Sequence, residues 1–379
     1  MIGSDVAVVG GGVIGLACAW RLAQRGASVT VFDAAPGSGA SHAAAGMLAP
    51  VTEVHHGEEP LLALNLASSR LWPEFASELV EVAGLDIGYR TEGTLAVALD
   101  DDDLRSLEEL RGFQESLRLP VSRLRARECR AREPSLSPRV RGGVLAEGDH
   151  QVDSRLAVQA LLAAVERAGA TLVREPVTAL SVADHAVTGV HTTSGLHACR
   201  TVVLAAGSWS AGIGGIPPAV LPAVRPVKGQ ILRLRFDPAA APLRGTIRGL
   251  AAGRPIYLVP RAHGELVVGA TVEEVGFDTT VTAGAVHDLL RAAIDLVPAV
   301  GELELVEATA RVRPGTPDNA PLLGPTTLGG LVLATGHHRN GVLLAPVTAE
   351  VIASVVTTGT VPPVAIGFDP GRFQRCTSA

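Results

Sequence analysis

The chain has 379 residues, of which 47% are hydrophobic and 18% charged, and its formal net charge is −6. This length predicts about two or three domain-sized units with sizeable cores, and the composition is typical of a soluble globular protein. The acidic balance argues against nucleic acid as the main partner. No uncharged run of about 18 or more apolar residues indicates a membrane span.

The cysteines are far apart in the sequence and show no CxxC spacing: Cys18, Cys129, Cys199 and Cys376. This pattern predicts neither a metal site nor a disulfide framework. The apolar N-terminus lacks the basic segment that precedes the core of a signal peptide. We therefore expect a protein of the reducing cytoplasm.

The first structural unit runs from Val6 to Asp33. Its pattern predicts a buried strand, a glycine turn, an apolar helix to about Arg25 and a second strand. The turn has the GxGxxG spacing of a dinucleotide site, with Gly10, Gly12 and Gly15. These glycines permit the tight turn, the approach of a pyrophosphate and close packing of helix on strand. The pyrophosphate would lie at the helix N-terminus, where unpaired N–H groups and the positive dipole end favour an anion.

Asp33 ends this unit with a carboxylate that can accept hydrogen bonds from a ribose. No arginine follows at residues 34–35 to hold a 2′-phosphate, so NADP is disfavoured. The next segment, Ala35–Pro50, is too rich in small residues for a regular element. It is either a flexible loop or a backbone against which a large flat ligand lies.

The following region predicts helices and one short strand. Pro60–Gly84 has apolar residues at helical spacing and predicts one long helix, with a kink at Pro73. Thr94–Ala98 predicts a strand. The acidic run Asp100–Asp103 indicates a helix N-cap and first turn rather than a metal site.

The middle of the chain returns to the pattern of the first unit. A helix is expected from about Ser154 to Ala168, and a strand pair from 175–181 and 186–193. Residues 198–210 predict a buried strand that stops at a small-residue turn, 205–207. We interpret this turn as a second nucleotide-facing turn of the same sheet.

In the last third of the chain, the pattern changes to alternating strands and then returns to a strand, a glycine turn and a helix. Period-two strands within 226–276 predict an antiparallel sheet in a second domain. A helix over 283–296 and a strand over 303–313 follow. Residues 331–356 predict a strand, a glycine turn and a helix that begins near Gly341, with Pro346 tolerated near its first turn.

This interleaving predicts an α/β fold with a Rossmann-like dinucleotide-binding domain and a second, α+β substrate domain built on an antiparallel sheet. Both domains are discontinuous. The predicted division assigns residues 1–85, 145–225 and 310–365 to the dinucleotide domain, 86–144 and 226–309 to the substrate domain, and 366–379 to a C-terminal tail.

Six motifs in order carry a resemblance to a known family: GGGVIG with Asp33, ASHAAAGMLAP, PVKGQ, YLVPR with LVVGAT, RVRPGTPD, and TGHHRNGVLLAP. Over nearly its whole length the chain resembles the D-amino-acid oxidase group of FAD-dependent amine oxidases, and within it the glycine oxidases of thiamin biosynthesis. The resemblance implies FAD as cofactor. Monomeric sarcosine oxidases attach flavin to a cysteine before the last helix, but the only late cysteine here is Cys376, so we expect a non-covalent flavin.

The resemblance also implies site residues. Besides the turn glycines, it assigns FAD contacts to Val13, Ile14, Asp33, Ala40, Ser41, Ala45, Gly46, Met47, Val177, His337, His338, Arg339, Asn340, Gly341, Val342 and Leu343. Arg313 and Arg339 would bind the substrate carboxylate, and Tyr257 would add a hydroxyl contact. The residue types agree, because a guanidinium fork holds a planar carboxylate well. The alternative for Arg313 is an ion pair that bridges the domains.

The implied reaction is the oxidation of glycine, and of sarcosine or small D-amino acids, by hydride transfer to flavin N5. Glycine would give glyoxylate and ammonia, with molecular oxygen reduced to hydrogen peroxide and the imine available for the thiazole of thiamin. No side-chain acid or base is required, because positioning does most of the work. The helix expected near Gly341 would stabilise negative charge on the reduced flavin. Members of this family often form homo-oligomers.

Alternatives remain at this point. A sarcosine oxidase-like enzyme or a D-amino-acid dehydrogenase has the same fold, and His338 and Val272 depart from the family pattern in ways that could alter pocket width. An NAD-dependent enzyme, or a dinucleotide-binding protein without turnover, is disfavoured because the segments 205–207 and 336–341 add nucleotide-facing turns. The adjacent pair His337 and His338 has no nearby acid or cysteine to complete a metal site.

Overall fold

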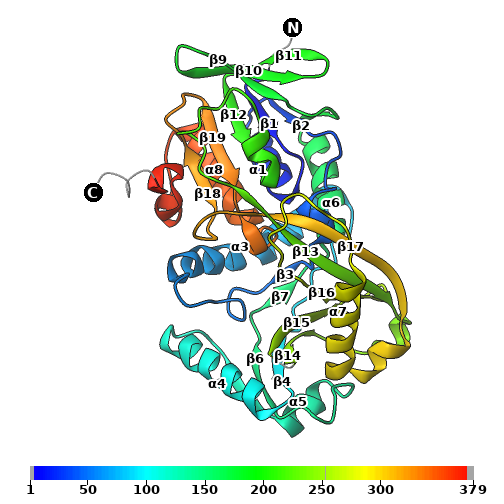
Figure 1. Ribbon diagram of the computed structural model, residues 1–379. Coiled ribbons are helices and arrows are strands. Elements are labelled where there is room, and N and C mark those ends of the chain that lie inside the picture. Colours follow the sequence, from blue (N-terminus) through cyan, green and yellow to red (C-terminus); the bar gives the residue numbers. More distant parts are fainter. Residues whose placement is uncertain (1–3, 252, 374–379) are drawn as a thin grey trace.

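The computed structural model describes residues 4–251 and 253–373. Figure 1 shows an upper part built on one sheet and a lower part built on another, and the long strands β13 (Arg225–Arg235) and β17 (Glu304–Gly315) of the lower sheet lie where the two parts meet. The predicted mixed α/β class, with a Rossmann-like part and an antiparallel-sheet part, is confirmed. None of the helices in the described chain combines the length and apolar character that crossing a membrane requires.

The upper sheet brings the predicted nucleotide-facing turns to one edge. Within the described residues it has six strands, in the order β18 (Leu322–Pro325), β19 (Leu331–Thr335), β12 (Thr201–Leu204), β1 (Val6–Val9), β2 (Val29–Phe32) and β8 (Thr171–Val173). Strand β1 pairs in parallel with β2 and β12, and β12 pairs in parallel with β19. The turns after β1, β12 and β19 therefore meet at the carboxyl edge, where doubly wound sheets bind ligands.

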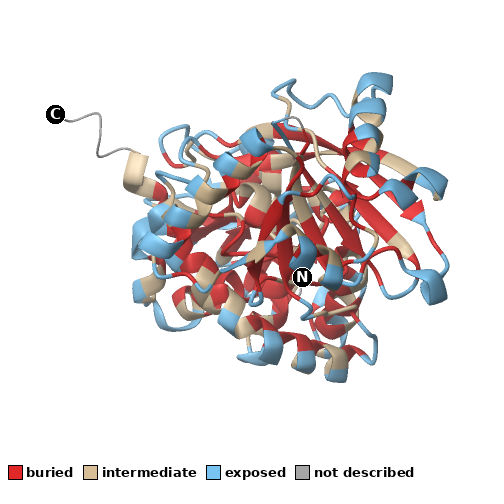
Figure 2. Ribbon diagram, turned by 90° about the horizontal axis from the view of Figure 1, so that it is seen from below, coloured by how far each residue is buried: buried red, intermediate tan, exposed pale blue. Residues whose placement is uncertain are grey.

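Both faces of this sheet are covered, which is why its central strands are apolar throughout. Val6 and Val8 of β1 pack toward a helical layer, whereas Ala7 and Val9 pack toward the opposite layer. The helical layer consists of α1 (Val13–Gln24), α3 (Glu59–Ala83), α6 (Ser154–Arg167) and α8 (Ala345–Thr358). The opposite layer contains the small sheet of β9 (Ala179–Ala183), β10 (Ala186–Thr192) and β11 (Gly195–Ala198). Figure 2 shows the buried strands enclosed by helices with exposed outer faces.

The lower sheet collects strands from two separated stretches of the chain. Its eight strands among the described residues run in the order β17, β13, β16 (Glu265–Gly269), β15 (Arg254–Pro260), β14 (Thr246–Ala251), β4 (Thr94–Ala98), β6 (Gly142–Ala146) and β5 (Ser122–Arg125). All pairs are antiparallel except β14 with β4. Helix α7 (Ala283–Leu296) packs on it through buried leucines and alanines.

Smaller elements complete the chain: α2 (Ala40–Ala43), β3 (Met47–Leu48), β7 (His150–Gln151), α4 (Asp101–Ser116) and α5 (Ala126–Arg132). The acidic run predicted as a cap behaves as one, since Asp100 accepts hydrogen bonds from the Asp102 and Asp103 amides. Asp153 caps α6 in the same way, through the amides of Arg155 and Leu156. The bounds of the two domains stay a prediction, and Cys376 lies outside the described residues.

Two expectations need correction, and the sequence pattern missed strand β14. The last helix begins at Ala345, not near Gly341, because a 3₁₀ turn over His338–Asn340 and further turns precede it. The strand expected from residue 175 begins only at Ala179. Strand β14 was not predicted, since Arg248 and Gly249 interrupt its apolar alternation.

Candidate active site

A cavity of about 600 Å³ lies between the two large sheets, at the carboxyl edge of β1, β12 and β19. One side is lined by the first glycine turn and by small residues of 37–47, and the other by β13, β15 and β17. Cavities of this size at the meeting of two structural units are the usual place for a small-molecule or cofactor site.

Two glycines of the turn after β1, Gly10 and Gly15, have the structural roles expected of them. Gly10 has φ of +109°, and a Cβ there would lie 2.5 Å from the carbonyl oxygen of Ala205. A Cβ on Gly15 would lie 1.9 Å from the carbonyl oxygen of Gly10, so α1 approaches β1 only without a side chain. Gly12 is different, because its nearest neighbour would be Ser41 Oγ at 3.4 Å and it faces the cavity. Gly12 therefore leaves open space at the start of α1.

The N-terminus of α1 is only partly capped. Its N-cap residue, Gly12, supplies no side-chain hydrogen bond, and the first turn contains no acidic residue. Ser41 Oγ accepts from the Val13 amide at 3.0 Å. Asp33 lines the cavity and already accepts from the Gly11 amide at 2.6 Å and the Ala35 amide at 2.8 Å. Its carboxylate has further lone pairs, so the predicted ribose contact remains compatible with this geometry.

The small-residue segment is not a flexible loop, because arginine side chains hold its carbonyl groups by hydrogen bonds. The His42 carbonyl accepts from Arg155 Nε at 2.9 Å and Arg233 Nη2 at 3.3 Å. The Ala45 carbonyl accepts from Arg261 Nη2 at 2.5 Å. Arg233 and Arg261 are buried, with 1% and 2% of their surface exposed. This support favours the interpretation that the segment lies against a ligand.

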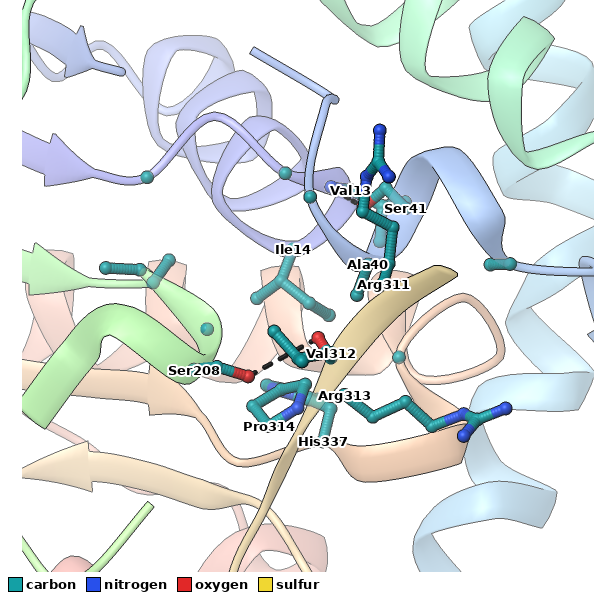
Figure 3. A pocket seen from close by; sticks show the side chains of 18 of the residues that line it. Val13, Ile14, Ala40, Ser41, Ser208, Arg311, Val312, Arg313, Pro314 and His337 are labelled. Carbon is teal, nitrogen blue, oxygen red and sulfur yellow. Dashed lines mark hydrogen bonds between the residues drawn. The ribbon is translucent and has the colours of Figure 1, made fainter. Parts of the chain in front are cut away.

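At the other end of the cavity, Arg313 on β17 carries a guanidinium that no described carboxylate neutralises. Its Nη1 donates to the Thr271 carbonyl at 3.2 Å. The guanidinium lies flat over Gly229, where a Cβ would come within 2.4 Å of both Nη atoms. The expected alternative, an ion pair bridging the domains, is therefore absent among the residues that the structure describes. Figure 3 shows Arg313 and Arg311 leaving the same strand with their guanidinium groups pointing in different directions.

Arg339 also lines the cavity, but acidic residues already engage it. Glu58 pairs with Arg339 Nη2, and Glu53 lies 4.0 Å from Arg339 Nε while pairing with Arg248. Although burial opposes it, Arg248 and Arg339 hold the pKa of the Glu53 carboxyl below its usual value. The two predicted carboxylate-binding arginines therefore differ, since only Arg313 has an unpaired charge among the described groups.

Tyr257 on β15 lines the cavity beside Arg313, as the resemblance implied. Its hydroxyl occupies the space above Gly269, where a Cβ would lie 2.3 Å from the hydroxyl oxygen. Burial raises the pKa of the Tyr257 hydroxyl, so the group stays protonated and can donate. It makes no hydrogen bond to another described residue, which leaves it available for a ligand.

The two adjacent histidines are neutral at physiological pH. Burial lowers the pKa of His337 to about 3, and its Nε2 contacts Thr348 Oγ1 at 3.0 Å. Burial, together with Arg339 and Arg313, lowers the pKa of His338 to about 4. His338 has φ of +48°, and its buried Nδ1 has no hydrogen-bond partner among the described residues. Neither histidine adds positive charge beside Arg313.

Most of the implied site residues line the cavity, with three exceptions: Gly15, Asn340 and Leu343. Gly15 acts through packing, and the Leu343 carbonyl accepts from Ser68 Oγ and Trp72 Nε1 instead. Val272, which the family pattern placed near the substrate, is 72% exposed and does not line the cavity.

Several cavity residues escaped sequence reasoning: Glu53, Gly229 and Arg311. Glu53 and its neighbour Glu58 follow the small-residue segment, and the only available signal was an acidic pair near an expected substrate arginine. Gly229 stands within the PVKGQ motif, where a glycine inside a predicted strand could have indicated a close approach.

Comparisons with known proteins agree with this geometry. The family model described as "FAD dependent oxidoreductase" (DAO) matches residues 5–355. The chain is 37% identical to a glycine oxidase of Geobacillus kaustophilus, over 93% of this chain and 92% of that protein. The crystal structure of glycine oxidase from Geobacillus kaustophilus superposes with a TM-score of 0.90 at 35% identity, covering 97% of this chain and 98% of that one.

A bifunctional ThiO/ThiG protein of Trichormus variabilis is 35% identical over 99% of this chain. The chain spans only 56% of the length of that relative. With the family model covering nearly all of the described residues, the chain belongs to the DAO family of FAD-dependent oxidoreductases.

Proposed function

We propose that this protein oxidises glycine, and with it sarcosine or small D-amino acids, in an FAD-dependent reaction that yields hydrogen peroxide. The observation that carries the proposal is the unpaired guanidinium of Arg313, fixed over Gly229 beside the Tyr257 hydroxyl. A substrate with one carboxylate matches the one unpaired guanidinium at this end of the cavity.

The residues present fit FAD. The open space at Gly12, the partly capped N-terminus of α1 and the supported segment around Ala45 form a cradle for a diphosphate and a flat ring system. When bound, FAD would supply the two-electron oxidation by accepting a hydride from the substrate Cα. The residues proposed to hold it are the cavity-lining members of the set implied by the family resemblance: Gly10, Gly12, Val13, Ile14, Asp33, Ala40, Ser41, Ala45, Gly46, Met47, Val177, His337, His338, Arg339, Gly341 and Val342.

We propose a non-covalent flavin. The described cysteines, Cys18, Cys129 and Cys199, are buried, and none of them lines the cavity. Precipitation with trichloroacetic acid should therefore leave the yellow colour in the supernatant. A yellow pellet would show a covalent link instead.

The chain's own side chains are proposed to bind and orient the substrate. Arg313 would donate two hydrogen bonds to the carboxylate, and Tyr257 would donate its hydroxyl to a carboxylate oxygen. His337 and His338 are neutral, so they do not compete with Arg313 for that carboxylate. Arg339 would contact the substrate while still paired with Glu58, which sets its position and reduces its net attraction. Orientation of this kind accounts for a site without an evident acid or base.

The similarity to a ThiO/ThiG protein supports a further part of the proposal, that the imine product serves thiazole formation in thiamin synthesis. We propose molecular oxygen as the electron acceptor, a cytoplasmic location and a homo-oligomeric state.

A peroxide-coupled assay tests the proposal directly. The purified protein should show flavin absorption bands and produce peroxide with glycine, and activity with sarcosine, D-alanine and D-proline would define its breadth. Bleaching of the flavin by a D-amino acid without peroxide in air would instead indicate a D-amino-acid dehydrogenase. A preference for sarcosine with little glycine turnover would indicate a sarcosine oxidase-like enzyme.

A further inference from the structure

Arg311 lies two residues before Arg313 on β17 and also lines the cavity. Its Nε donates to the Ser38 carbonyl at 2.9 Å, and its Nη1 donates to the Ala310 carbonyl at 2.7 Å and to Thr309 Oγ1 at 3.2 Å. These contacts hold the Nε and Nη1 atoms of the guanidinium in place. In the described part of the chain, its Nη2 has no hydrogen-bond partner and no carboxylate pairs with it.

The position of this guanidinium is set by the segment that Arg311 contacts. Ser38 precedes α2, whose Ser41 Oγ accepts from the Val13 amide at the start of α1. Figure 3 shows the Arg311 side chain extending toward Val13 and Ser41, whereas Arg313 extends away from them. Arg311 thus brings a cation from the lower sheet to the glycine-turn end of the cavity.

The charges around Arg311 leave room for an anion. The first turn of α1 has no acidic residue, and Asp33 is engaged by the amides of Gly11 and Ala35. The other arginines near this segment differ, because Arg155 pairs with Glu307 and Arg233 pairs with Glu265. A guanidinium without a counter-charge, lining the same cavity as the positive end of a helix, is suited to bind a phosphate group.

We propose that Arg311 binds the diphosphate of FAD from the side opposite the α1 N-terminus. The proposal rests on the FAD-dependent function proposed above and deepens it. Strand β17 of the lower sheet would then supply Arg311 for the cofactor diphosphate and Arg313 for the substrate carboxylate, since alternate residues of a strand share a face. The diphosphate would lie between the helix dipole on one side and a planar cation on the other.

The test measures flavin release from the holoenzyme, without turnover. Increasing concentrations of ADP or of adenosine displace FAD, and the fluorescence of the released flavin gives an inhibition constant for each competitor. In the unaltered protein ADP should compete much more strongly than adenosine, because only ADP carries the diphosphate. In Arg311→Ala the ratio of the adenosine constant to the ADP constant should fall by about tenfold, because one charge-assisted contact to the diphosphate is lost.

Further variants separate a phosphate contact from a structural role. Arg311→Gln keeps a donor for the Ser38 carbonyl without the charge, so its ratio should fall as in Arg311→Ala. Arg311→Lys keeps the charge and should recover part of the ratio. The matched control is Arg235→Ala on neighbouring β13, whose 62% exposed side chain pairs with Glu304 outside the cavity and should leave the ratio unchanged.

Two results would overturn the proposal. Equal weakening of ADP and adenosine in Arg311→Ala would show that Arg311 only anchors the segment at Ser38. Full recovery of the ratio by Arg311→Gln would show that a donor, not a cation, is needed. Failure of the proposed glycine oxidation would be seen separately in the peroxide assay, since flavin release does not depend on turnover.

Discussion

The two ends of the cavity are built in contrasting ways. The glycine-turn end consists mainly of backbone groups and small residues from one nearly continuous stretch, residues 9–47. The other end, which is proposed to bind the substrate and is called the substrate end below, consists of large charged and polar side chains, Glu53, Tyr257, Arg313 and Arg339, which come from distant parts of the chain. At the first end, glycines let the backbone approach closely, and at the second, Gly229 and Gly269 make room for other residues' side chains.

This contrast shows how each end distinguishes ligands. A turn made of backbone groups recognises the diphosphate that many dinucleotides have in common. Its glycine motif therefore occurs in many dinucleotide-binding proteins. A set of charged side chains is specific because its net charge depends on which arginine is paired. At this end of the cavity, Arg313 has no carboxylate partner among the described residues whereas Arg339 pairs with Glu58, so the proposed specificity for one carboxylate rests on a balance of tertiary contacts.

The largest effect is expected from adding a side chain at Gly15, at the glycine-turn end of the cavity. Gly15→Ala would place a Cβ 1.9 Å from the Gly10 carbonyl oxygen, so we expect loss of bound FAD and poor recovery of folded protein. The cost should exceed the about 1–3 kcal/mol of ordinary overpacking, because backbone must move. Flavin content and thermal unfolding check this. Gly284→Ala in α7 is the control, since its Cβ would meet nothing within 4 Å. Normal flavin content in Gly15→Ala would contradict the packing argument.

The substrate end should be most sensitive to Arg313. Arg313→Ala removes the unpaired cation and should raise KM for glycine by roughly 30-fold to several thousand-fold, equivalent to about 2–5 kcal/mol. FAD content should stay normal, which separates the two ends. Steady-state kinetics with a flavin spectrum of the same sample provide the measurement. If KM is unchanged, Arg313 does not bind the carboxylate.

A smaller effect should follow from disturbing the surface beneath that arginine. Gly229→Ala would place a Cβ 2.4 Å from the Arg313 Nη atoms, which must then shift. We expect KM for glycine to rise by roughly 10- to 100-fold while the charge and the bound FAD remain. Combining Gly229→Ala with Arg313→Ala should add little to the effect of Arg313→Ala alone. Fully additive effects would mean that Gly229 acts on something other than Arg313.

The smallest expected effect is a change in how the free energy of unfolding depends on pH. His337 stays neutral in the folded protein down to about pH 3, whereas its ordinary pKa is 6.5. The unfolded chain therefore binds one more proton below pH 6.5, and His337 makes stability fall as pH decreases through that window, by about 1.4 kcal/mol per pH unit. Asp149 acts in the opposite direction between its ordinary pKa of 3.8 and about 6, because burial raises its pKa.

Denaturant unfolding between about pH 4.5 and 6 can isolate the contribution of His337. His337→Asn keeps a polar partner for Thr348 Oγ1. It should reduce the slope of the unfolding free energy against pH by about 1.4 kcal/mol per pH unit, the contribution of one proton. His287→Asn is the control, because that side chain is 68% exposed. Equal slopes in the unaltered protein and in His337→Asn would show that His337 does not resist protonation.

Local patterns predicted much of the fold. Helix α7 and strand β4 have the predicted bounds, and the cap at Asp100 was readable from short-range chemistry. The start of α8 was misplaced, because the turns at 341–344 have helix-like sequence but bend the chain toward the cavity before Ala345. Periodicity reports which face is buried and does not report where a turn ends.

By itself the sequence determined the glycine-turn end, because its residues lie within a short motif with a local physical purpose, and the family resemblance implied Arg313 on β17. The tertiary structure alone decided which charges remain unpaired. Glu58 and Arg339 are far apart in the chain and meet through the packing of α3 near the turn at 338–344, while no described acid reaches Arg313. Electrostatic balance depends on distances between side chains from separate elements, and those distances are fixed only when the sheets and helices pack.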